Sequence, residues 1–300
     1  MANANATWDL VDEGAFPQRP IDTRWSEEAE SRTKDLIGRY HRAMRNHDQR
    51  IASCDEMWNG LGKEQRDYAR LHYMYGGRSA LKCMVDALIA ADAPLPGSIL
   101  DFPSAHGRVT RFLHVAFPES ELWAGDLNVD GVDFCAEHFA AKPFYSSADL
   151  LKVSFPRKFD LIWCGSLASH LPEGQCKALF SLLLDSLQPN GILCITTCGR
   201  GMQWAHENVF KTINDDAYAK ICAELELHSF GFAPYNYRYG AYETSESYGM
   251  AFLTPGWVER NILSPAVQVL MMREKAWHGA QDIWCLLNRP ISSWYDWARA

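Results

Sequence analysis

The chain has 300 residues, 47% of them hydrophobic, which is enough to form one large or two small cores. Its formal net charge of −8 argues against a polyanion as the main partner, because proteins that bind nucleic acids rely on a basic face. The N-terminus has no signal-peptide pattern, no apolar run reaches the roughly 18 to 20 residues of a membrane span, and the nine cysteines include no Cys-x-x-Cys pair. We therefore expect a cytoplasmic protein without a membrane span.

The first part of the chain predicts a helical cap. Residues up to about 25 have no regular pattern, and Ser26 then begins a charged stretch that is typical of a helix start. Two helical segments follow, at about 27–57 and 63–92, with an Asn- and Gly-rich turn between them. Prolines and a glycine close this region, so we expect residues 1–95 to form an N-terminal arm and helical cap.

Strands and helices alternate over the next hundred residues. The strand candidates are SILDF, ELWAGD, PFYSSAD, FDLIWCG and GILCITT, and the helices between them lie at about 107–117, 129–140 and 173–187. This alternation predicts a parallel sheet with right-handed crossovers and helices on both faces. We expect residues 96–200 to form a Rossmann-like α/β cofactor domain, in which a nucleotide binds at the carboxyl ends of the strands.

The pattern is less regular in the last hundred residues. A helix is expected at about 214–226, and two further strands at 247–253 and 281–287. The segment 265–277 fits either a helix or a strand. Residues 201–300 are thus expected to add an acceptor-binding insertion and the last strands of a doubly wound, seven-stranded, mostly parallel sheet.

The turn after the first strand is the most informative motif. Ile99 and Leu100 lead into Asp101, and a tight turn of small residues then opens a helix at Gly107. The free N–H groups and the positive end of such a helix face whatever the turn holds. The next strand also ends in an acid, Asp126, at a distance that suits the hydroxyls of a ribose. This order of residues predicts an adenosine-containing cofactor.

The composition of the turn bears on which cofactor it holds. It reads DFPSAHG, so only Gly107 remains where a dinucleotide-binding turn has three glycines. Pro103 lacks an N–H and Ala105 adds a methyl group, so the turn suits a small amino-acid moiety better than a pyrophosphate. A nicotinamide-dependent oxidoreductase is therefore the weaker alternative.

The order of these segments, continued by SSADLL, FDLIWCGSLASHL and LQPNGIL, resembles the class I S-adenosylmethionine-dependent methyltransferases over residues 98–200. The variant turn, DFC at 133–135, SYGMAF and QDIW are similar to methyltransferases associated with bacterial polysaccharide biosynthesis. The resemblance implies S-adenosylmethionine as the cofactor. The contacts it implies are Asp101, Pro103, Ser104, Gly107, Asp126, Leu127, Ala148, Asp149, Cys164, Gly165 and Ser166.

The resemblance also assigns roles to these residues. Asp101 would help to hold the methionine ammonium, Asp126 the ribose, and Asp149 the adenine amino group. Leu127 would pack on the adenine, and residues 164–166 would line the sulfonium side. Taken singly, Asp101 and Asp126 could instead cap helices, and Asp149 could be a turn acid.

One segment of the N-terminal region, LHYMYGGRSAL at 71–81, has two interpretations. It could fold over the cofactor as a lid, with Tyr73 and Tyr75 near the methionine end and Arg78 near the carboxylate. It could equally be a helix that is kinked at its glycine pair and packed on the sheet.

Methyl transfer to a hydroxyl requires a base, and histidine titrates near neutral pH. His170 is the first candidate because it follows the fourth strand, where cofactor and substrate are expected to meet. His206, after the fifth strand, is the second, and His278 near Asp282 is the third. His106 lies inside the turn and is interpreted as a residue that shapes the cofactor pocket. A structural role is the alternative for each histidine.

Aromatic residues crowd the region after the fifth strand. They suit sugar rings or other partly polar acceptors, and we expect an acceptor pocket that includes Trp204, Tyr235, Tyr237 and Tyr239. Alternatively, these side chains form a satellite core or an interface in a homo-oligomer. No cluster of His, Cys, Asp and Glu has the spacing of metal ligands, so we expect no metal site.

Together, these patterns predict an enzyme that transfers a methyl group from S-adenosylmethionine to an oxygen, or secondarily a nitrogen, of a glycan or small molecule. A non-catalytic partner subunit that keeps the fold is one alternative; the substituted turn favours it and the three acids argue against it. An RNA-directed methyltransferase is another. Against an amino-directed nucleic-acid enzyme, the chain reads CGSL after the fourth strand instead of Asn/Asp-Pro-Pro-Tyr, and its net charge is acidic.

Overall fold

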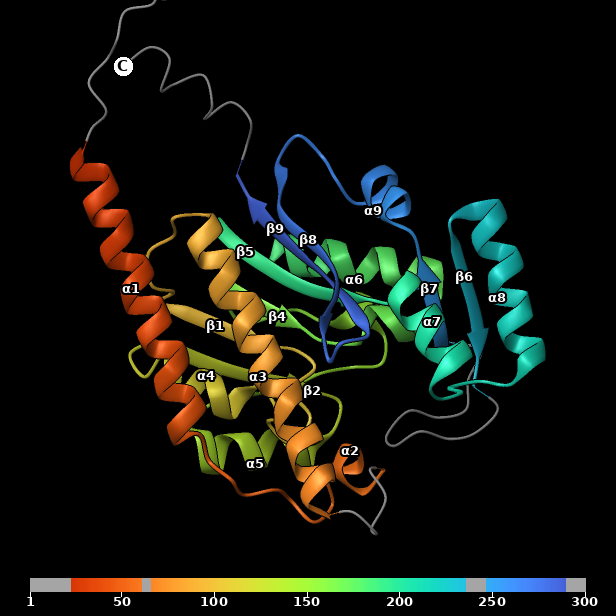
Figure 1. The fold of residues 1–300 in the computed structure, drawn as a ribbon, viewed down its shortest axis with the longest axis horizontal. Coiled ribbons are helices and arrows are strands. Elements are labelled where there is room, and N and C mark those ends of the chain that lie inside the picture. Colours follow the sequence, from red (N-terminus) through yellow and green to blue (C-terminus); the bar gives the residue numbers. More distant parts are fainter. Residues whose placement is uncertain (1–22, 61–65, 236–246, 290–300) are drawn as a thin grey trace, which may run out of the picture.

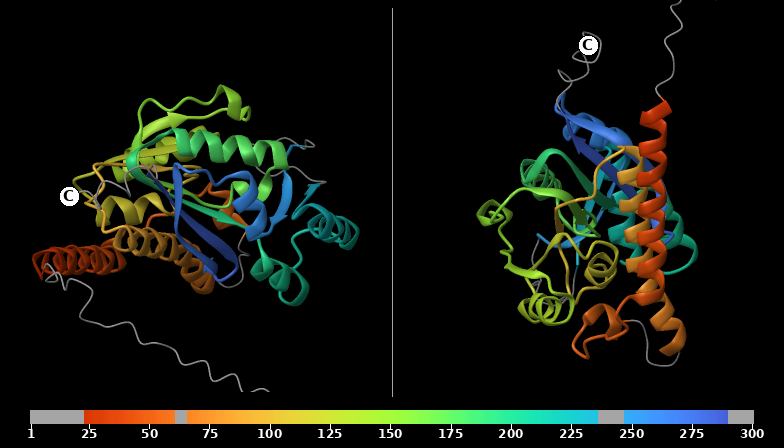
Figure 2. Two further views of the ribbon diagram at one scale, coloured as in Figure 1. Left: turned by 90° about the horizontal axis from the view of Figure 1, so that it is seen from above. Right: turned by 90° about the vertical axis from the view of Figure 1, so that its left-hand side faces the viewer.

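The computed structural model describes residues 23–60, 66–235 and 247–289. Two long helices, α1 (Thr23–Asn46) and α3 (Arg66–Ala90), lie side by side along one face of the molecule (Figures 1 and 2). Between them in the chain is the four-residue helix α2, Glu56–Asn59. The predicted N-terminal helical cap is therefore present.

The first cap helix, predicted to run to about residue 57, ends at Asn46. Polar side chains then bind the backbone in place of helical hydrogen bonds. Asp48 accepts a hydrogen bond from the amide of Arg50 (2.7 Å). Asp55 caps α2 by accepting from the amide of Met57 (2.9 Å). Short acidic side chains compete with a continuous helix in this way, which separates α2 from α1.

Seven strands form one sheet in the order β3-β2-β1-β4-β5-β9-β8. They are β1 (Ser98–Asp101), β2 (Glu121–Asp126), β3 (Lys142–Tyr145), β4 (Phe159–Cys164), β5 (Leu187–Thr197), β8 (Val267–Trp277) and β9 (Gln281–Asn288). The first five are parallel, and β9 is antiparallel to both β5 and β8. The strand order reverses at β1 and β4, where doubly wound sheets bind their ligands. The predicted seven-stranded, mostly parallel sheet is confirmed.

Helices cover both faces of this sheet. α4 (Thr110–Ala116) and α5 (Val129–Phe139) pack with α3 against one face, around a buried cluster that includes Phe112. α6 (Glu173–Asp185) and α9 (Pro255–Asn261) cover the other face, around a second buried cluster. Consecutive residues of the strands alternate between the two clusters, as the pleat of a sheet requires. Two single-turn 3₁₀ helices are η2 (Leu150–Lys152) and η3 (Ala168–His170).

The last third of the chain corrects one prediction. The strand expected at 247–253 is β7 (Gly249–Leu253), but it pairs with β6 (Phe230–Pro234) in a separate two-stranded sheet and not in the main one. The seventh strand of the main sheet is β8 instead. β8 and β9 form a hairpin because His278 and Gly279 both have positive φ (54° and 70°), which suits a tight turn between twisted strands. The remaining helices are α7 (Arg200–Asn208) and α8 (Asp215–His228).

In the part of the chain that the structure describes, no helix is long and apolar enough to cross a bilayer. None of its groups of His, Cys, Asp or Glu side chains brings three ligands together for a metal ion. All nine cysteines are free thiols. The domain boundaries near residues 95 and 200 and the cytoplasmic location stay predictions.

Candidate active site

The turn after β1 is held by its backbone and by one left-handed glycine. The amide of Ser104 donates to the carbonyl oxygen of Gly125 (2.9 Å), which fastens the turn to β2. Gly107 has a φ of +73°, and a Cβ there would lie 2.4 Å from the ring of Phe139 and 2.9 Å from Cys135 Sγ. Only glycine fits this position, so the one glycine that remains in the turn is the one the packing requires.

The helix predicted to open at Gly107 begins at Thr110. Arg111 binds the carbonyls of the intervening turn: its Nε donates to Gly107 O (2.9 Å) and its Nη2 to His106 O (3.2 Å). The same buried guanidinium donates to the carbonyl of Asp48 (3.2 Å). Arg111 thus joins the turn to the segment after α1. No local sequence pattern identifies this role, because arginine is usually a surface residue.

Asp126 ends β2 with its carboxylate buried beneath the turn. Its Oδ2 accepts from the amide of Ala105 (2.8 Å) and its Oδ1 from the amide of Asn128 (2.9 Å). Burial raises the pKa of Asp126 above its ordinary value, although these amides favour the charged form. Because a carboxylate has about four acceptor sites, Asp126 can hold the turn and still accept from a ligand.

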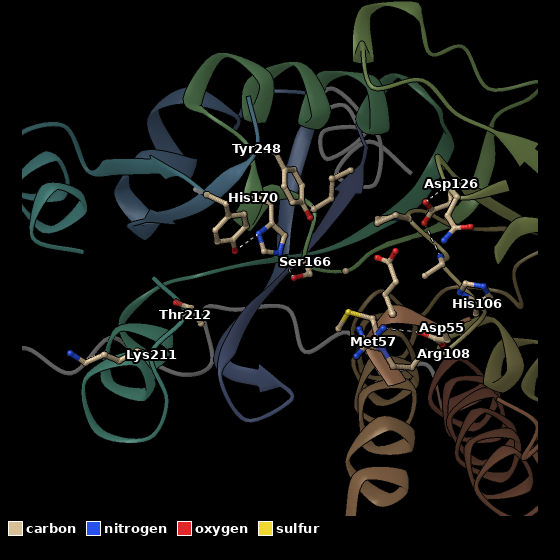
Figure 3. A pocket seen from close by; sticks show the side chains of 17 residues that line it. Asp55, Met57, His106, Arg108, Asp126, Ser166, His170, Lys211, Thr212 and Tyr248 are labelled. Atoms are coloured by element: carbon tan, nitrogen blue, oxygen red, sulfur yellow. Dashed lines mark hydrogen bonds between the residues drawn. The ribbon is translucent and has the colours of Figure 1, made fainter. Parts of the chain in front are cut away.

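A cavity of about 430 Å³ lies at the carboxyl ends of the strands (Figure 3). Six of the predicted site residues line it: Pro103, Asp126, Gly165, Ser166, His170 and Tyr235. In Figure 3, Asp126 and His106 lie on one side of the cavity, and Ser166, His170 and Tyr248 lie on the other. The volume is within the range of ligand pockets. The fold therefore brings residues of the predicted cofactor and acceptor regions to one cavity.

Two smaller cavities, each of about 30 Å³, share lining residues with the main one. Leu127 and Ala148 line the first, which is mainly apolar and also borders Asp126. Ser104 lines the second, together with Arg108. Three more of the predicted cofactor residues thus lie beside the same cavity.

Arg108 places a cation in the cavity wall that the motifs did not indicate. Its guanidinium carbon lies 5.2 Å from the centroid of the Trp277 ring, and its Nη1 lies 3.4 Å from Nε2 of His278. Within the described ranges, Arg108 has no carboxylate partner. An arginine in this setting can bind a carboxylate of a ligand.

Helix α2 forms another part of the cavity wall, through Asp55, Glu56 and Met57. The carboxylate of Asp55 is buried and accepts from the hydroxyl of Tyr73 on α3 (2.6 Å). The acid followed by Glu-Met-Trp carries the signal of a helix cap. That signal does not show that α2 folds against a turn some fifty residues further along the chain.

His170 ends η3 and has a defined tautomer. Its Nδ1 lies 2.9 Å from the carbonyl oxygen of Gly249, and because a carbonyl only accepts, Nδ1 carries the proton and Nε2 the lone pair. Nε2 lies 3.3 Å from Ser166 Oγ. Burial lowers the pKa of His170, so the ring is neutral near pH 7. The rings of Tyr248 and Tyr235 flank it, with centroids at 5.1 and 5.9 Å.

The other two predicted acids differ from each other. Asp101 is buried, and its Oδ2 accepts from Thr110 Oγ1 (2.6 Å). Its Oδ1 has no partner among the residues described. Burial raises the pKa of Asp101 to about 7. Asp149 instead caps η2 by accepting from the amide of Leu151 (3.1 Å) and pairs with Lys152. It lines none of the three cavities, and in the structure its side chain serves as the turn acid.

The segment predicted as a lid is the middle of α3. Tyr75 is 48% exposed and lines none of the three cavities. The Nε of Arg78 lies 3.3 Å from Met44 Sδ on α1, away from the cavity lining. A Cβ at Gly77 would lie 2.1 Å from a backbone carbonyl of the cofactor turn, so the glycine pair lets α3 pack closely. The packed-helix interpretation therefore describes this segment, and the lid does not.

Three further predicted residues lie outside the cavity lining. Trp204 is 54% exposed on α7. His206 is buried and accepts from the amide of Thr212 (3.2 Å). Its ring lies tilted against that of Tyr218, with centroids 4.2 Å apart, and it does not line the cavity. Cys164 is buried in the cluster on the α6 face. Tyr237 and Tyr239 lie outside the described residues.

Comparison with known proteins identifies the class to which this fold and site correspond. Residues 99–191 match the family model of a methyltransferase domain. The match falls on the segment predicted to bind the cofactor, and it makes this segment a methyltransferase domain, the class predicted from the sequence. The predicted cofactor, S-adenosylmethionine, is the cofactor of this class. The association with polysaccharide biosynthesis stays a prediction.

Several solved structures of methyltransferases are similar in fold to this chain, at low sequence identity. A S-adenosylmethionine-dependent methyltransferase from Clostridium acetobutylicum is 14% identical, with 75% of this chain and 95% of that chain covered and a TM-score of 0.48. The glycopeptide N-methyltransferase MtfA is 13% identical, with 69% and 89% covered and a TM-score of 0.44. The N-methyltransferase NodS from Bradyrhizobium japonicum is 10% identical, with 87% and 98% covered and a TM-score of 0.43. No curated protein matches the sequence significantly.

Proposed function

We propose that this methyltransferase acts on a hydroxyl group of a glycan or small molecule, with an amine as the alternative acceptor. The observation that carries the proposal is His170, a neutral ring in the cavity wall with Nδ1 bound to the carbonyl of Gly249 and a lone pair on Nε2. A hydroxyl keeps its proton near pH 7, so its methylation gains from a base in this position. A neutral amine already has a free lone pair and needs such a base less.

The residues around the cavity fit S-adenosylmethionine. Asp126 would accept from the ribose hydroxyls, and the apolar slot beside it, with Leu127, would take the adenine. Arg108 would pair with the methionine carboxylate. The unpartnered Oδ1 of Asp101 supports a role toward the methionine ammonium, because a buried acceptor without a donor is unfavourable.

When bound, S-adenosylmethionine supplies a methyl group on a positively charged sulfur, which keeps the carbon–sulfur electron pair while the acceptor oxygen forms its new bond. The chain itself aligns the acceptor and removes its proton. In this proposal the proton ends on Nε2 of His170. Tyr235 and Tyr248 flank that ring, and their aromatic faces with polar tips suit a sugar ring or a similar acceptor.

The proposal assigns a part to each region of the chain. Residues 96–200 bind the cofactor, residues 1–95 cap it through α2, and residues 201–300 supply the acceptor side through β6 and β7. The nine free thiols support a reducing compartment such as the cytoplasm.

The first experiment is a calorimetric titration with S-adenosylmethionine, S-adenosylhomocysteine and NAD. We expect the first two to bind with micromolar affinity and NAD not to bind. Sugars, other alcohols and amines are then screened as acceptors, and His170→Ala should keep cofactor affinity while transfer slows about a hundredfold or more. Absence of cofactor binding would favour the partner-subunit alternative. Transfer to amines only, at a rate that His170→Ala does not change, would contradict the hydroxyl acceptor.

The role of Arg108 has its own test. Arg108→Met keeps most of the side-chain length over Trp277 but removes the charge. It should weaken S-adenosylhomocysteine about 10- to 100-fold and leave adenosine, which has no carboxylate, within about twofold. Equal loss for both ligands would mean that the substitution disturbs the cavity and that Arg108 does not read the carboxylate.

A further inference from the structure

Four polar side chains form a continuous hydrogen-bonded chain that leads from the sheet to the cavity. Thr196, at the end of β5, donates from Oγ1 to Gln281 Oε1 on β9 (2.7 Å). Gln281 Nε2 donates to Ser166 Oγ (3.0 Å). Ser166 Oγ lies 3.3 Å from Nε2 of His170. Ser166 and His170 line the cavity, whereas the other two side chains lie behind it.

The partners at the two ends set the direction of every hydrogen bond in this chain. The backbone amide of Ser166 donates to Thr196 Oγ1 (2.7 Å), so the threonine proton is free for the Gln281 oxygen. This turns the amide nitrogen of Gln281 toward Ser166, whose oxygen must then accept. At the other end, the carbonyl of Gly249 keeps the proton of His170 on Nδ1. The hydroxyl proton of Ser166 therefore has two acceptors at 3.3 Å, the lone pair of Nε2 and the oxygen of Ser169, whose own proton is donated elsewhere.

A neighbouring serine provides a natural comparison. Ser169 Oγ also lies 3.3 Å from Ser166 Oγ, but its own proton is donated to the backbone oxygen of Ser166 (2.6 Å). Among the described residues, Ser169 makes no hydrogen bond to the ring of His170, and it does not line the cavity. It can steady the turn without taking part in proton transfer.

The backbone at Ser166 also has an unusual conformation. Its φ is +66°, in the left-handed region, which is unfavourable for a residue other than glycine. The turn that follows β4 keeps this conformation while the side chain contacts both Gln281 and His170. The lone pair of Nε2 thus faces the hydroxyl of Ser166, and both side chains line the cavity.

We propose that Ser166 is a catalytic residue that passes the proton of the acceptor hydroxyl to His170. As the acceptor oxygen forms its bond to the methyl carbon, its proton moves to Ser166 Oγ, and the proton of Ser166 moves to Nε2 of His170. The serine ends unchanged and the histidine ends as an imidazolium. Gln281 and Thr196 are positioning residues, because they keep the serine oxygen an acceptor toward β9 and a donor toward His170. This inference rests on the proposed hydroxyl acceptor.

The titration of His170 reports on this arrangement. The other groups that face the ring are uncharged near pH 7: the hydroxyl of Tyr235 (3.1 Å from Nδ1), the ring of Tyr248 and the carbonyl of Gly249. A hydrogen bond donated to Nε2 stabilises the neutral ring and keeps its pKa low. Loss of that bond should therefore raise the pKa of His170.

The test is NMR titration of the histidine rings in three variants of the full chain, with no ligand added. Ser166→Gly removes the hydroxyl and tolerates the left-handed φ, and should raise the pKa of His170 by about half to one unit. Gln281→Glu reverses the hydrogen bond between residues 281 and 166, because a carboxylate accepts the proton of Ser166. A lone pair of the serine oxygen then faces Nε2 of His170. This variant should raise the pKa further than Ser166→Gly. The control, Ser169→Ala, should leave it unchanged.

A second measurement follows the protons during turnover, with methyl α-glucoside and phenol as probe hydroxyl acceptors. In mixtures of H₂O and D₂O, a plot of the wild-type rate against the fraction of D₂O should be curved, as expected for two moving protons. Ser166→Gly should be slower, and its plot should be linear. An unchanged pKa of His170 in Ser166→Gly, or linear wild-type behaviour, would overturn the role of Ser166. If the pKa shifts occur but only amines are methylated, the proposed hydroxyl acceptor fails, and the proton-passing role fails with it.

Discussion

Asp126→Asn tests the residue on which both the turn and the cofactor depend. The two carboxylate oxygens accept from two different amides, those of Ala105 (2.8 Å) and Asn128 (2.9 Å). Asparagine has only one acceptor oxygen, so one amide would face an NH₂ group. A hydrogen bond to a charged group contributes about 1.5–3 kcal/mol. If the carboxylate also accepts from the ribose hydroxyls, as proposed, the loss of one such contact should lower the affinity for S-adenosylhomocysteine about 10- to 150-fold.

The effect on folding should be smaller than the effect on binding. Burial already raises the pKa of Asp126, which means that its charge is unfavourable there, and an uncharged side chain avoids that penalty. Calorimetry with S-adenosylhomocysteine measures the affinity, and thermal unfolding measures the stability. Asp130→Asn is the matched control, because this residue is exposed in the first turn of α5 and lines none of the cavities. Unchanged affinity in Asp126→Asn, or equal losses in both variants, would refute the reasoning.

Three further substitutions test the packing, the charge and the position of particular residues. Gly107→Ala should lower the free energy of unfolding by about 2–4 kcal/mol, because φ is positive there and the new Cβ would collide with Phe139. The control is Gly174→Ala, at a helix glycine with open space around it, for which chemical denaturation should show a gain of about 0.5–1 kcal/mol. Because burial raises the pKa of Asp101 to about 7, the folded protein keeps a proton that the unfolded chain loses near pH 4. The contribution of Asp101 to folding stability therefore falls as the pH rises toward 7 and is lost above it. Asp101→Asn should therefore be more stable relative to wild type at pH 8 than at pH 5.5 in urea unfolding, and equal differences at the two pH values would contradict the assignment. Tyr75→Ala should bind S-adenosylhomocysteine within about twofold of wild type in the same calorimetric assay, and a larger loss would restore the lid interpretation.

Local patterns in the chain predicted most of the cofactor half. Short apolar runs that alternate with amphipathic helices commit the chain to parallel strands with crossovers, and acids at strand ends meet at one edge of the sheet. Asp126, Ser166 and His170 could be placed there because Asp126 ends β2 and the other two lie in the segment that follows β4. The role of Asp149 toward the adenine stays a prediction: its side chain caps the next helical turn, while its neighbours Ala148 and Leu150 line the small cavity.

The assignments that failed depended on contacts between distant segments. A helix such as α3 has the same sequence pattern whether it covers a ligand or packs on a turn, and Gly77 allows the second by admitting a backbone carbonyl. Strand pairing has the same limit: β7 looks like a sheet strand locally, but it pairs with β6, and β8 takes its place beside β9.

What the sequence determined by itself was therefore the order of elements, the turn and the acids at the strand ends, because each follows from neighbours along the chain. The tertiary structure alone decided that Arg108 borders the cavity, that Arg111 joins the turn to the segment after α1, and that Gln281 reaches Ser166 across 115 residues. These contacts depend on how sheet and helices pack in three dimensions. The hydrogen bonds that orient His170, the proposed base, are of that second kind.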